Sequence, residues 1–203
     1  MRSLALSLLL TLVLVPAASA ANRGFGGFTY NYSFSTLDLQ TYVDENSWYG
    51  ATIDVRRYLT DSKNLTFGLS TGWYIFYNSV DQVIEVPNGA VSGLQYRNFN
   101  ILPILAGLHY AVGNPHGLRP YVGLNAGAYY ARQEFDIGIY AKTPDNWHFG
   151  LAPEAGVLYP VWYETYFYCN ARYHYLFPAG GYLAGQALEL GFLTLAVGIV
   201  WDY

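Results

Sequence analysis

Apolar and polar residues alternate along most of this chain. The last eleven residues show the pattern most clearly, because a large apolar set is interleaved with a small or polar set. The large set is Leu193, Leu195, Val197, Ile199, Trp201 and Tyr203, and the other set is Thr194, Ala196, Gly198, Val200 and Asp202. A period of two residues is that of a β-strand, whose successive side chains point to opposite faces.

Seven earlier stretches repeat this alternation, and together with the terminal one they predict eight strands. The predicted strands lie at about 28–35, 49–56, 65–75, 96–112, 121–130, 147–159, 167–175 and 193–203. Between them we expect long connections at 38–47, 78–93 and 132–146, and short turns at 60–64, 113–117 and 160–164. Glycines recur in the small set, which suits a narrow closed interior.

The large apolar face is better explained by lipid than by a soluble core. It ends in two aromatic residues at the C-terminus, where a soluble domain usually frays. In a transmembrane β-barrel, the apolar face meets lipid, the polar face lines the interior and aromatic residues lie at headgroup level. We therefore predict an all-β fold for residues 21–203: an eight-stranded antiparallel up-and-down transmembrane β-barrel with both termini at the periplasmic end.

Composition agrees with a membrane protein. Of the 203 residues, 53% are hydrophobic, 18% are aromatic and 12% are charged, whereas charged residues usually make up about 25%. The net charge of −4 argues against nucleic acid as a partner.

Residues 1–20 are predicted to be a signal peptide. Arg2 provides a basic start, an apolar run extends from Leu4 to Val15, and Ala18-Ser19-Ala20 provides a cleavage pattern of small residues. The apolar run is shorter than the roughly 20 residues that a spanning helix needs. We expect cleavage after Ala20 and localisation in the bacterial outer membrane.

Two internal runs and the aromatic C-terminus resemble the outer-membrane protein β-barrel domain family, in its small OmpA/OmpX-like class. The runs extend from Leu118 to Tyr130 and from Asn146 to Val157. The resemblance covers essentially the whole mature chain and implies an architecture, not an activity, because such barrels include adhesins, anchors, conduits and lipid-modifying enzymes. It also implies that Trp201 and Tyr203 form a C-terminal signal for the barrel-assembly machinery.

Charged residues in the inward phase are the strongest candidates for a site. They form a predicted lumen polar cluster of Asp54, Arg56, Glu154 and Arg172, with Asp202 in the same phase on the last strand. If the turn after the sixth predicted strand centres near Trp162, Glu154 lies about opposite Asn170 and diagonal to Arg172. We interpret the cluster as an ion-paired plug, and a gated polar pore or a catalytic group are the alternatives.

Little in the sequence favours catalysis or metal binding. The single cysteine, Cys169, falls in the outward phase, and His148 and His174 are isolated inward residues without a partner at metal-ligand spacing. No serine near His174 could serve as its nucleophile. We therefore expect no catalytic residues, no metal or cofactor site and no enzyme activity.

The sequence thus favours a non-enzymatic outer-membrane barrel with a side-chain-filled lumen and a structural or interaction role. A small channel for solutes or hydrophobic molecules is the first alternative, and a lipid-modifying enzyme is the second. Expected partners are outer-membrane lipid and an extracellular or envelope ligand of the loops, and we expect a monomer. Aromatic residues in or beside the long loops suit an interaction surface: Tyr42, Trp48, Tyr77 and Tyr140.

Overall fold

The computed structural model describes residues 24–203 except 87–88, 115–116, 139, 181 and 183–186. The predicted signal peptide and its cleavage after Ala20 lie outside the described residues and stay predictions.

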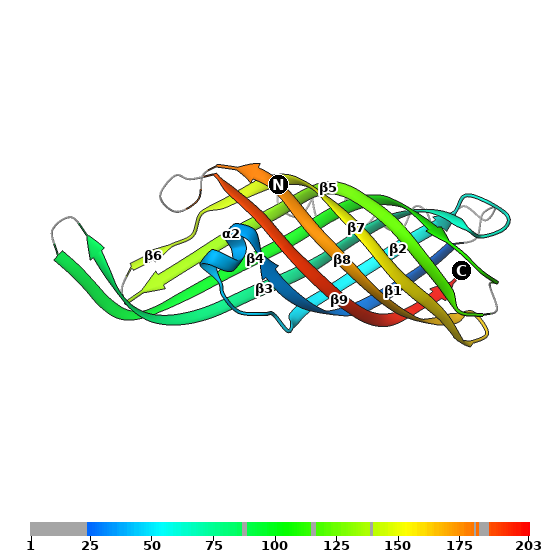
Figure 1. Ribbon diagram of the computed structural model, residues 1–203, viewed down its shortest axis with the longest axis horizontal. Helices are drawn as coiled ribbons and strands as arrows, with labels where there is room; N and C mark the ends of the chain where they lie inside the picture. The colour runs from blue at the N-terminus through cyan, green and yellow to red at the C-terminus, as the bar shows by residue number, and fades with distance from the viewer. Residues whose placement is uncertain (1–23, 87–88, 115–116, 139, 181, 183–186) are drawn as a thin grey trace, which may run out of the picture.

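The described chain forms one closed antiparallel barrel (Figure 1). Its eight long strands are β1 (Gly24–Thr36), β2 (Tyr49–Tyr58), β3 (Leu65–Val86), β4 (Gly89–Ala111), β5 (Arg119–Ile137), β7 (Asp145–Trp162), β8 (Thr165–Ala179) and β9 (Leu188–Asp202). Each pairs with the next, and β1 closes the barrel by pairing with β9. The short β6 (Tyr140–Lys142) adds to the end of β5. This confirms the predicted eight-stranded up-and-down barrel.

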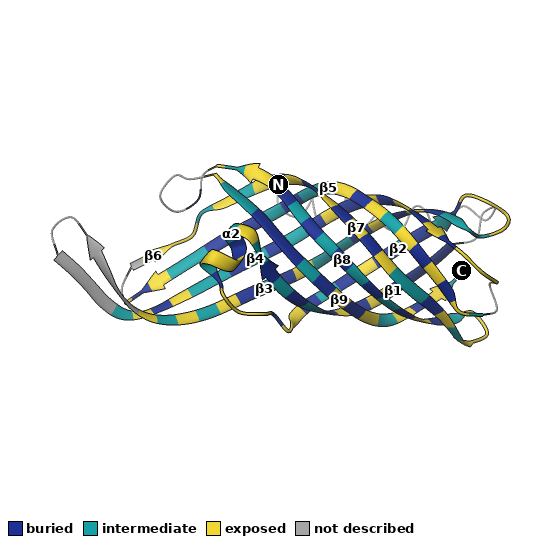
Figure 2. Cartoon of the chain, viewed as in Figure 1, coloured by how far each residue is buried: buried dark blue, intermediate teal, exposed yellow. Residues whose placement is uncertain are grey.

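The predicted inward and outward faces are also confirmed. Buried and exposed residues alternate along the strands, as the banding in Figure 2 shows. The predicted fourth strand, in which both faces are apolar, is an example: Ile104 and Leu108 are exposed, whereas Leu105 and His109 are buried. Large apolar side chains therefore cover the outside of the barrel.

Two of the predicted long connections are wrong, because 78–86, 89–93 and much of 132–146 are strand. β3 and β4 pair as far as Val86 and Gly89, and β5 continues to Ile137, where β6 pairs with it. The paired strands extend beyond the barrel mouth (Figure 1). We call this extension the outer lobe; it consists of residues 77–86 of β3, 89–98 of β4, 134–137 of β5, and β6. Outside a membrane both faces of a strand can be polar. The alternation of apolar and polar residues that identifies a lipid-facing strand is therefore weaker there.

The predicted connection 38–47 contains a short helix that the sequence did not reveal, α2 (Leu37–Tyr42). Leu39 and Val43 are fully buried in one apolar cluster with Phe76, Phe99 and Phe192. The Asp38 carboxylate also accepts the backbone N–H of Glu189 at 2.7 Å. α2 therefore folds back against inward side chains at the outer end of the barrel.

Two prolines interrupt the strand pairing without shifting it. Pairing of β3 with β4 stops between Thr71 and Tyr74, where Pro103 is the neighbour, and resumes in the same register. Pairing of β7 with β8 is interrupted in the same way at Pro153. Because proline has no N–H to donate, each costs a hydrogen bond and forms no bulge.

Candidate functional site

The centre of the barrel contains a buried charged network built around Glu154 of β7. One carboxylate oxygen accepts a hydrogen bond from Arg56 Nη2 of β2 at 2.6 Å, and the other accepts one from Arg172 Nε of β8 at 2.5 Å. Glu154 is thus shared by two arginines from different strands. Charge-assisted hydrogen bonds of this kind are stronger than neutral ones.

Asp54 of β2 is the second acid of the network. Its Oδ1 atom lies 3.0 Å from Arg172 Nη2 and 3.5 Å from Arg56 Nη2. The four side chains are between 0 and 3% exposed. Two acids and two bases balance in formal charge, as burial away from water requires. The structure therefore brings together all four residues of the predicted lumen polar cluster.

Neutral side chains extend the network around Arg56. Arg56 Nη2 donates to the Tyr168 hydroxyl at 2.5 Å, and Tyr121 and Asn170 donate to the same hydroxyl at 2.6 and 2.8 Å. The Arg56 guanidinium also lies 5.0 Å from the centre of the Tyr121 ring, within the range of cation–π attraction. These contacts join β2, β5 and β8 across the barrel.

Further polar partners come from the remaining walls. Ser70 of β3 accepts from Arg172 Nη1 at 3.0 Å, and Asn125 of β5 donates to Glu154 at 3.2 Å. His109 of β4 places Nε2 3.1 Å from Glu154 Oε1. His109 is not among the candidates that the sequence predicts, although its inward phase in the fourth predicted strand is a signal that could identify it.

The predicted diagonal placement of Glu154 and Arg172 is wrong, because the two residues are directly opposite each other and Asn170 faces Gly156. β7 extends to Trp162, and the pairing of β7 with β8 shifts between Pro160 and Trp162. The turn is therefore centred later in the chain than we assumed, which brings Glu154 and Arg172 closer.

Apolar layers lie on both sides of the network. Towards the outer lobe, a cluster includes Leu39, Phe76, Phe99, Leu176 and Phe192, and towards the other end a second cluster includes Phe25, Tyr58, Leu158, Tyr166 and Val200.

Burial raises the pKa of the Tyr42 phenol of α2 above its ordinary value. The neutral phenol donates to the Glu134 carbonyl at 2.8 Å.

The two histidines singled out in the sequence make buried hydrogen bonds. His174 Nδ1 lies 3.1 Å from the Tyr129 hydroxyl, and its ring stacks on Phe192 with 4.3 Å between ring centres. His148 bonds the Phe177 carbonyl and the Tyr182 hydroxyl. Cys169 is a free, half-buried thiol. Among the described residues, no group of three side chains could hold a metal ion.

Where β9 pairs with β1 and closes the barrel, Trp201 and Tyr203 point outward and are 50% and 44% exposed. The Tyr203 N–H donates to the Gly24 carbonyl at 2.9 Å, so the last residue pairs with the start of β1. Asp202 points inward and binds the Tyr58 hydroxyl at 2.9 Å and Lys63 Nζ at 2.8 Å. It is thus separate from the central network.

The closed barrel of eight antiparallel strands, with an apolar exterior and a charged interior, is the architecture of the small OmpA/OmpX-like outer-membrane barrels. Among solved structures, the chain is similar to neisserial surface protein A (NspA), with 15% identity, a TM-score of 0.57, and coverage of 90% of this chain and 97% of that one. It is also similar to Ail, the attachment invasion locus protein of Yersinia pestis, with 16% identity, a TM-score of 0.53, and coverage of 90% and 99%.

The outer membrane protease OmpT of Escherichia coli is a further structural neighbour, with 8% identity, a TM-score of 0.50, and coverage of 90% and 95%. No family model and no curated protein sequence matches the chain. In the described part of the chain, no helix is long and apolar enough to cross a membrane. At these identities the comparisons define the fold, so function has to be argued from the residues themselves.

Proposed function

We propose that this protein is a non-enzymatic integral barrel of the bacterial outer membrane, with a lumen closed by side chains and an outer lobe that serves interaction. The observation that carries this proposal is the buried network of Glu154, Asp54, Arg56 and Arg172. Its salt bridges connect β2, β7 and β8 across the interior and leave no net charge on the four residues.

A conducting pore would need side chains that face water. The central charges are instead bonded to one another, and small barrels of this strand number fill their interiors with side chains. The apolar clusters above and below the network add two further layers that disfavour water. α2 belongs to the layer on the outer-lobe side through Leu39, so it closes part of the barrel interior at that end.

The exterior supports the placement in a membrane. The outward side chains from Leu102 to Tyr110 on β4 and from Val122 to Tyr130 on β5 are apolar or aromatic, and each stretch is in the range of about 9–11 residues needed to cross a bilayer as a strand. In this proposal the signal peptide is removed after Ala20, and the assembly machinery reads Trp201 and Tyr203.

The outer lobe is the best candidate for an interaction surface. Tyr77 and Tyr96 stack on its outward face with 6.3 Å between ring centres, and each is 44% exposed. Leu94 is 45% exposed on the same face. Exposed aromatic residues are common where proteins bind partners. Trp48, beside β2, is also exposed, whereas Tyr42 is bound into the α2 contacts.

An enzyme is the less supported alternative. The three histidines that the structure describes, His109, His148 and His174, are at most 4% exposed and point into the barrel. A lipid-modifying enzyme needs its nucleophile and base within reach of the lipid face. Nothing in the contacts of these histidines pairs one of them with a serine hydroxyl in the described residues.

Conductance in planar bilayers distinguishes a closed barrel from a channel. Refolded protein is added to a planar membrane after its folded fraction has been measured by the mobility shift between unheated and boiled samples on an SDS gel. We expect no steady single-channel openings from folded protein. Regular openings of uniform size would contradict the closed-lumen proposal and favour the channel.

A further inference from the structure

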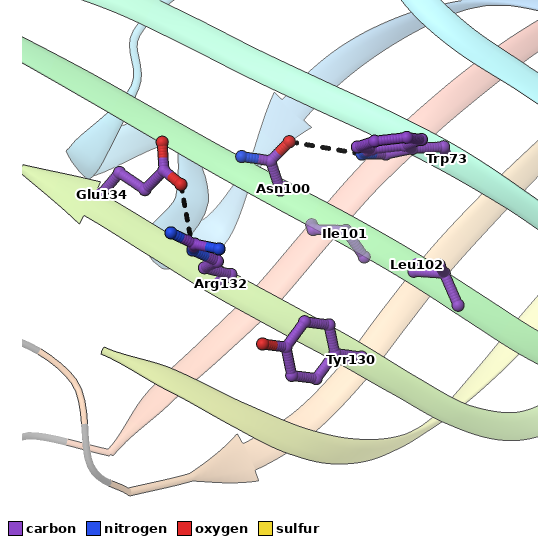
Figure 3. A pocket seen from close by; sticks show the side chains of 7 residues that line it. All are labelled: Trp73, Asn100, Ile101, Leu102, Tyr130, Arg132 and Glu134. Carbon is purple, nitrogen blue, oxygen red and sulfur yellow. Dashed lines mark hydrogen bonds and ion pairs between the residues drawn. The ribbon is translucent and has the colours of Figure 1, made fainter. Parts of the chain in front are cut away.

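The outer wall of the barrel carries a notch that is separate from the central network. Its volume is about 220 Å³, and it lies on β3, β4 and β5 (Figure 3). Trp73, Leu102 and Tyr130 form its apolar part, and Asn100, Arg132 and Glu134 form its polar part. Small-molecule sites commonly combine an apolar surface with a few convergent polar groups.

The strand register places the notch at the boundary between apolar and polar residues on the outside of the barrel. Leu102 lies beside Tyr130, and one step further along the same face Asn100 lies beside Arg132. From there the outward residues towards the membrane centre are apolar, such as Ile104, whereas those towards the outer lobe are mixed polar and aromatic, such as Asn98 and Tyr96. In a membrane barrel this boundary is the level of the lipid headgroups.

The polar part of the notch has no net charge but many hydrogen-bonding groups. Arg132 Nε lies 2.9 Å from Glu134 Oε1, and these two side chains are 48% and 28% exposed. The Trp73 indole N–H donates to Asn100 Oδ1 at 3.2 Å. A paired Arg and Glu beside an amide offer both donors and acceptors. The charges of Arg132 and Glu134 cancel, and Asp145, whose carboxylate accepts a hydrogen bond from the Tyr130 hydroxyl at 2.5 Å, adds a negative charge beside the notch, so the site does not favour an anion.

Aromatic rings flank these groups. The exposed Trp73 and the half-exposed Tyr130 line the notch, and the stacked Tyr77 and Tyr96 lie further out on the same face. A sugar ring offers C–H groups that pack on aromatic faces and hydroxyls that both donate and accept hydrogen bonds. The chemistry of the notch matches that combination better than it matches a phosphate.

We propose that this notch binds the neutral saccharide headgroup of a membrane glycolipid, whose hydrocarbon chains lie along the outward apolar residues below Leu102. The hydroxyls bond to Asn100, Arg132 and Glu134, and a sugar ring packs on Trp73. The proposal rests on the membrane assignment above, because the notch lies on the lipid-facing wall.

Native mass spectrometry of the intact barrel tests the proposal. The refolded protein in detergent micelles is titrated with monogalactosyl diacylglycerol or with phosphatidylglycerol of the same chain length. We expect retained galactolipid to exceed retained phosphatidylglycerol at equal concentrations. The double change Arg132→Met and Glu134→Gln should weaken galactolipid binding by about tenfold, since it removes charge-assisted hydrogen bonds. Trp73→Leu should weaken it through the lost ring.

Arg57→Met is the matched control, because Arg57 is a half-buried arginine on β2, outside the notch. It should bind galactolipid like the wild type. Equal retention of both lipids, stronger retention of phosphatidylglycerol, or unchanged binding by both notch variants would overturn the proposal. Folding is checked separately by the gel shift. A wild type that cannot fold in micelles would overturn the membrane assignment too, whereas folded protein without the preference overturns the notch alone.

Discussion

Replacing Glu154 with glutamine should be the most damaging conservative change in the barrel. Glu154→Gln keeps the size of the side chain and one acceptor oxygen but removes the charge that two arginines share. Asp54 would then be the remaining carboxylate partner of Arg56 and Arg172 in the network, and its distances to them are longer, at 3.5 and 3.0 Å. Leaving a buried charge uncompensated costs about 3–5 kcal/mol of unfolding free energy.

Urea unfolding in lipid vesicles, followed by tryptophan fluorescence, measures this change. Glu154→Gln should lower the midpoint without changing the slope, since the folded surface stays the same. Adding Arg172→Met restores charge balance, because Arg56 and Asp54 then remain as one pair. The double variant should therefore lose less stability than the two single variants combined, which a double-mutant cycle reports directly.

Lys63→Met provides the control for removing a charge outside the network. Lys63 pairs with Asp202, and the two side chains are 25% and 12% exposed, so this partly exposed pair should contribute less than the fully buried network, about 1 kcal/mol. If Glu154→Gln stays within about 1 kcal/mol of the wild type, the arginines are solvated in the folded barrel. The reasoning from burial and charge would then be refuted.

Three further outcomes follow from the fold. The mature protein should fractionate with the outer membrane and migrate faster on SDS gels when unheated, and recovery from the soluble periplasm without a shift would contradict a membrane barrel. Leu39→Ala should cost about 2–5 kcal/mol in urea unfolding, because it leaves a cavity under α2, and an unchanged midpoint would mean that α2 does not pack in solution. Deletion of Tyr203 should reduce assembly in cells more than refolding in detergent, whereas Asp202→Asn should leave insertion nearly intact; equal losses would show that we have misread this strand.

The sequence predicts the barrel wall well because lipid imposes a strict contrast on it. Between Leu102 and Tyr110, for example, every outward side chain must suit lipid and every inward one must fit a narrow interior. The same contrast identified Asp54, Arg56, Glu154 and Arg172 as inward residues. Which of them touch depends on strand register, and a turn centred about one residue later than Trp162 was enough to change the residue opposite Glu154 from Asn170 to Arg172.

The outer lobe and α2 were not predicted, because the alternation of apolar outward and polar inward residues ends before them. Beyond Ile75 the strands leave the apolar band, and residues such as Asp81 and Asn88 favour a loop although pairing continues up to Val86. α2 has only six residues, too few for a helical period to show. Its burial of Leu39 depends on Phe99 and Phe192, which are distant in sequence, so no local pattern reveals it.

Inward-facing glycines make room for the buried charged network. A Cβ atom at Gly123 would come within 2.1 Å of the His109 ring, and one at Gly68 would come within 2.8 Å of Arg56 Cγ. Both distances are far below ordinary van der Waals contact, so a methyl group at either position would displace a polar side chain. Eight strands enclose too little space for large residues on every wall. Glycine on β5 and β3 therefore provides the room in which His109 and Arg56 reach Glu154, and the network could not assemble in a barrel of this size without it.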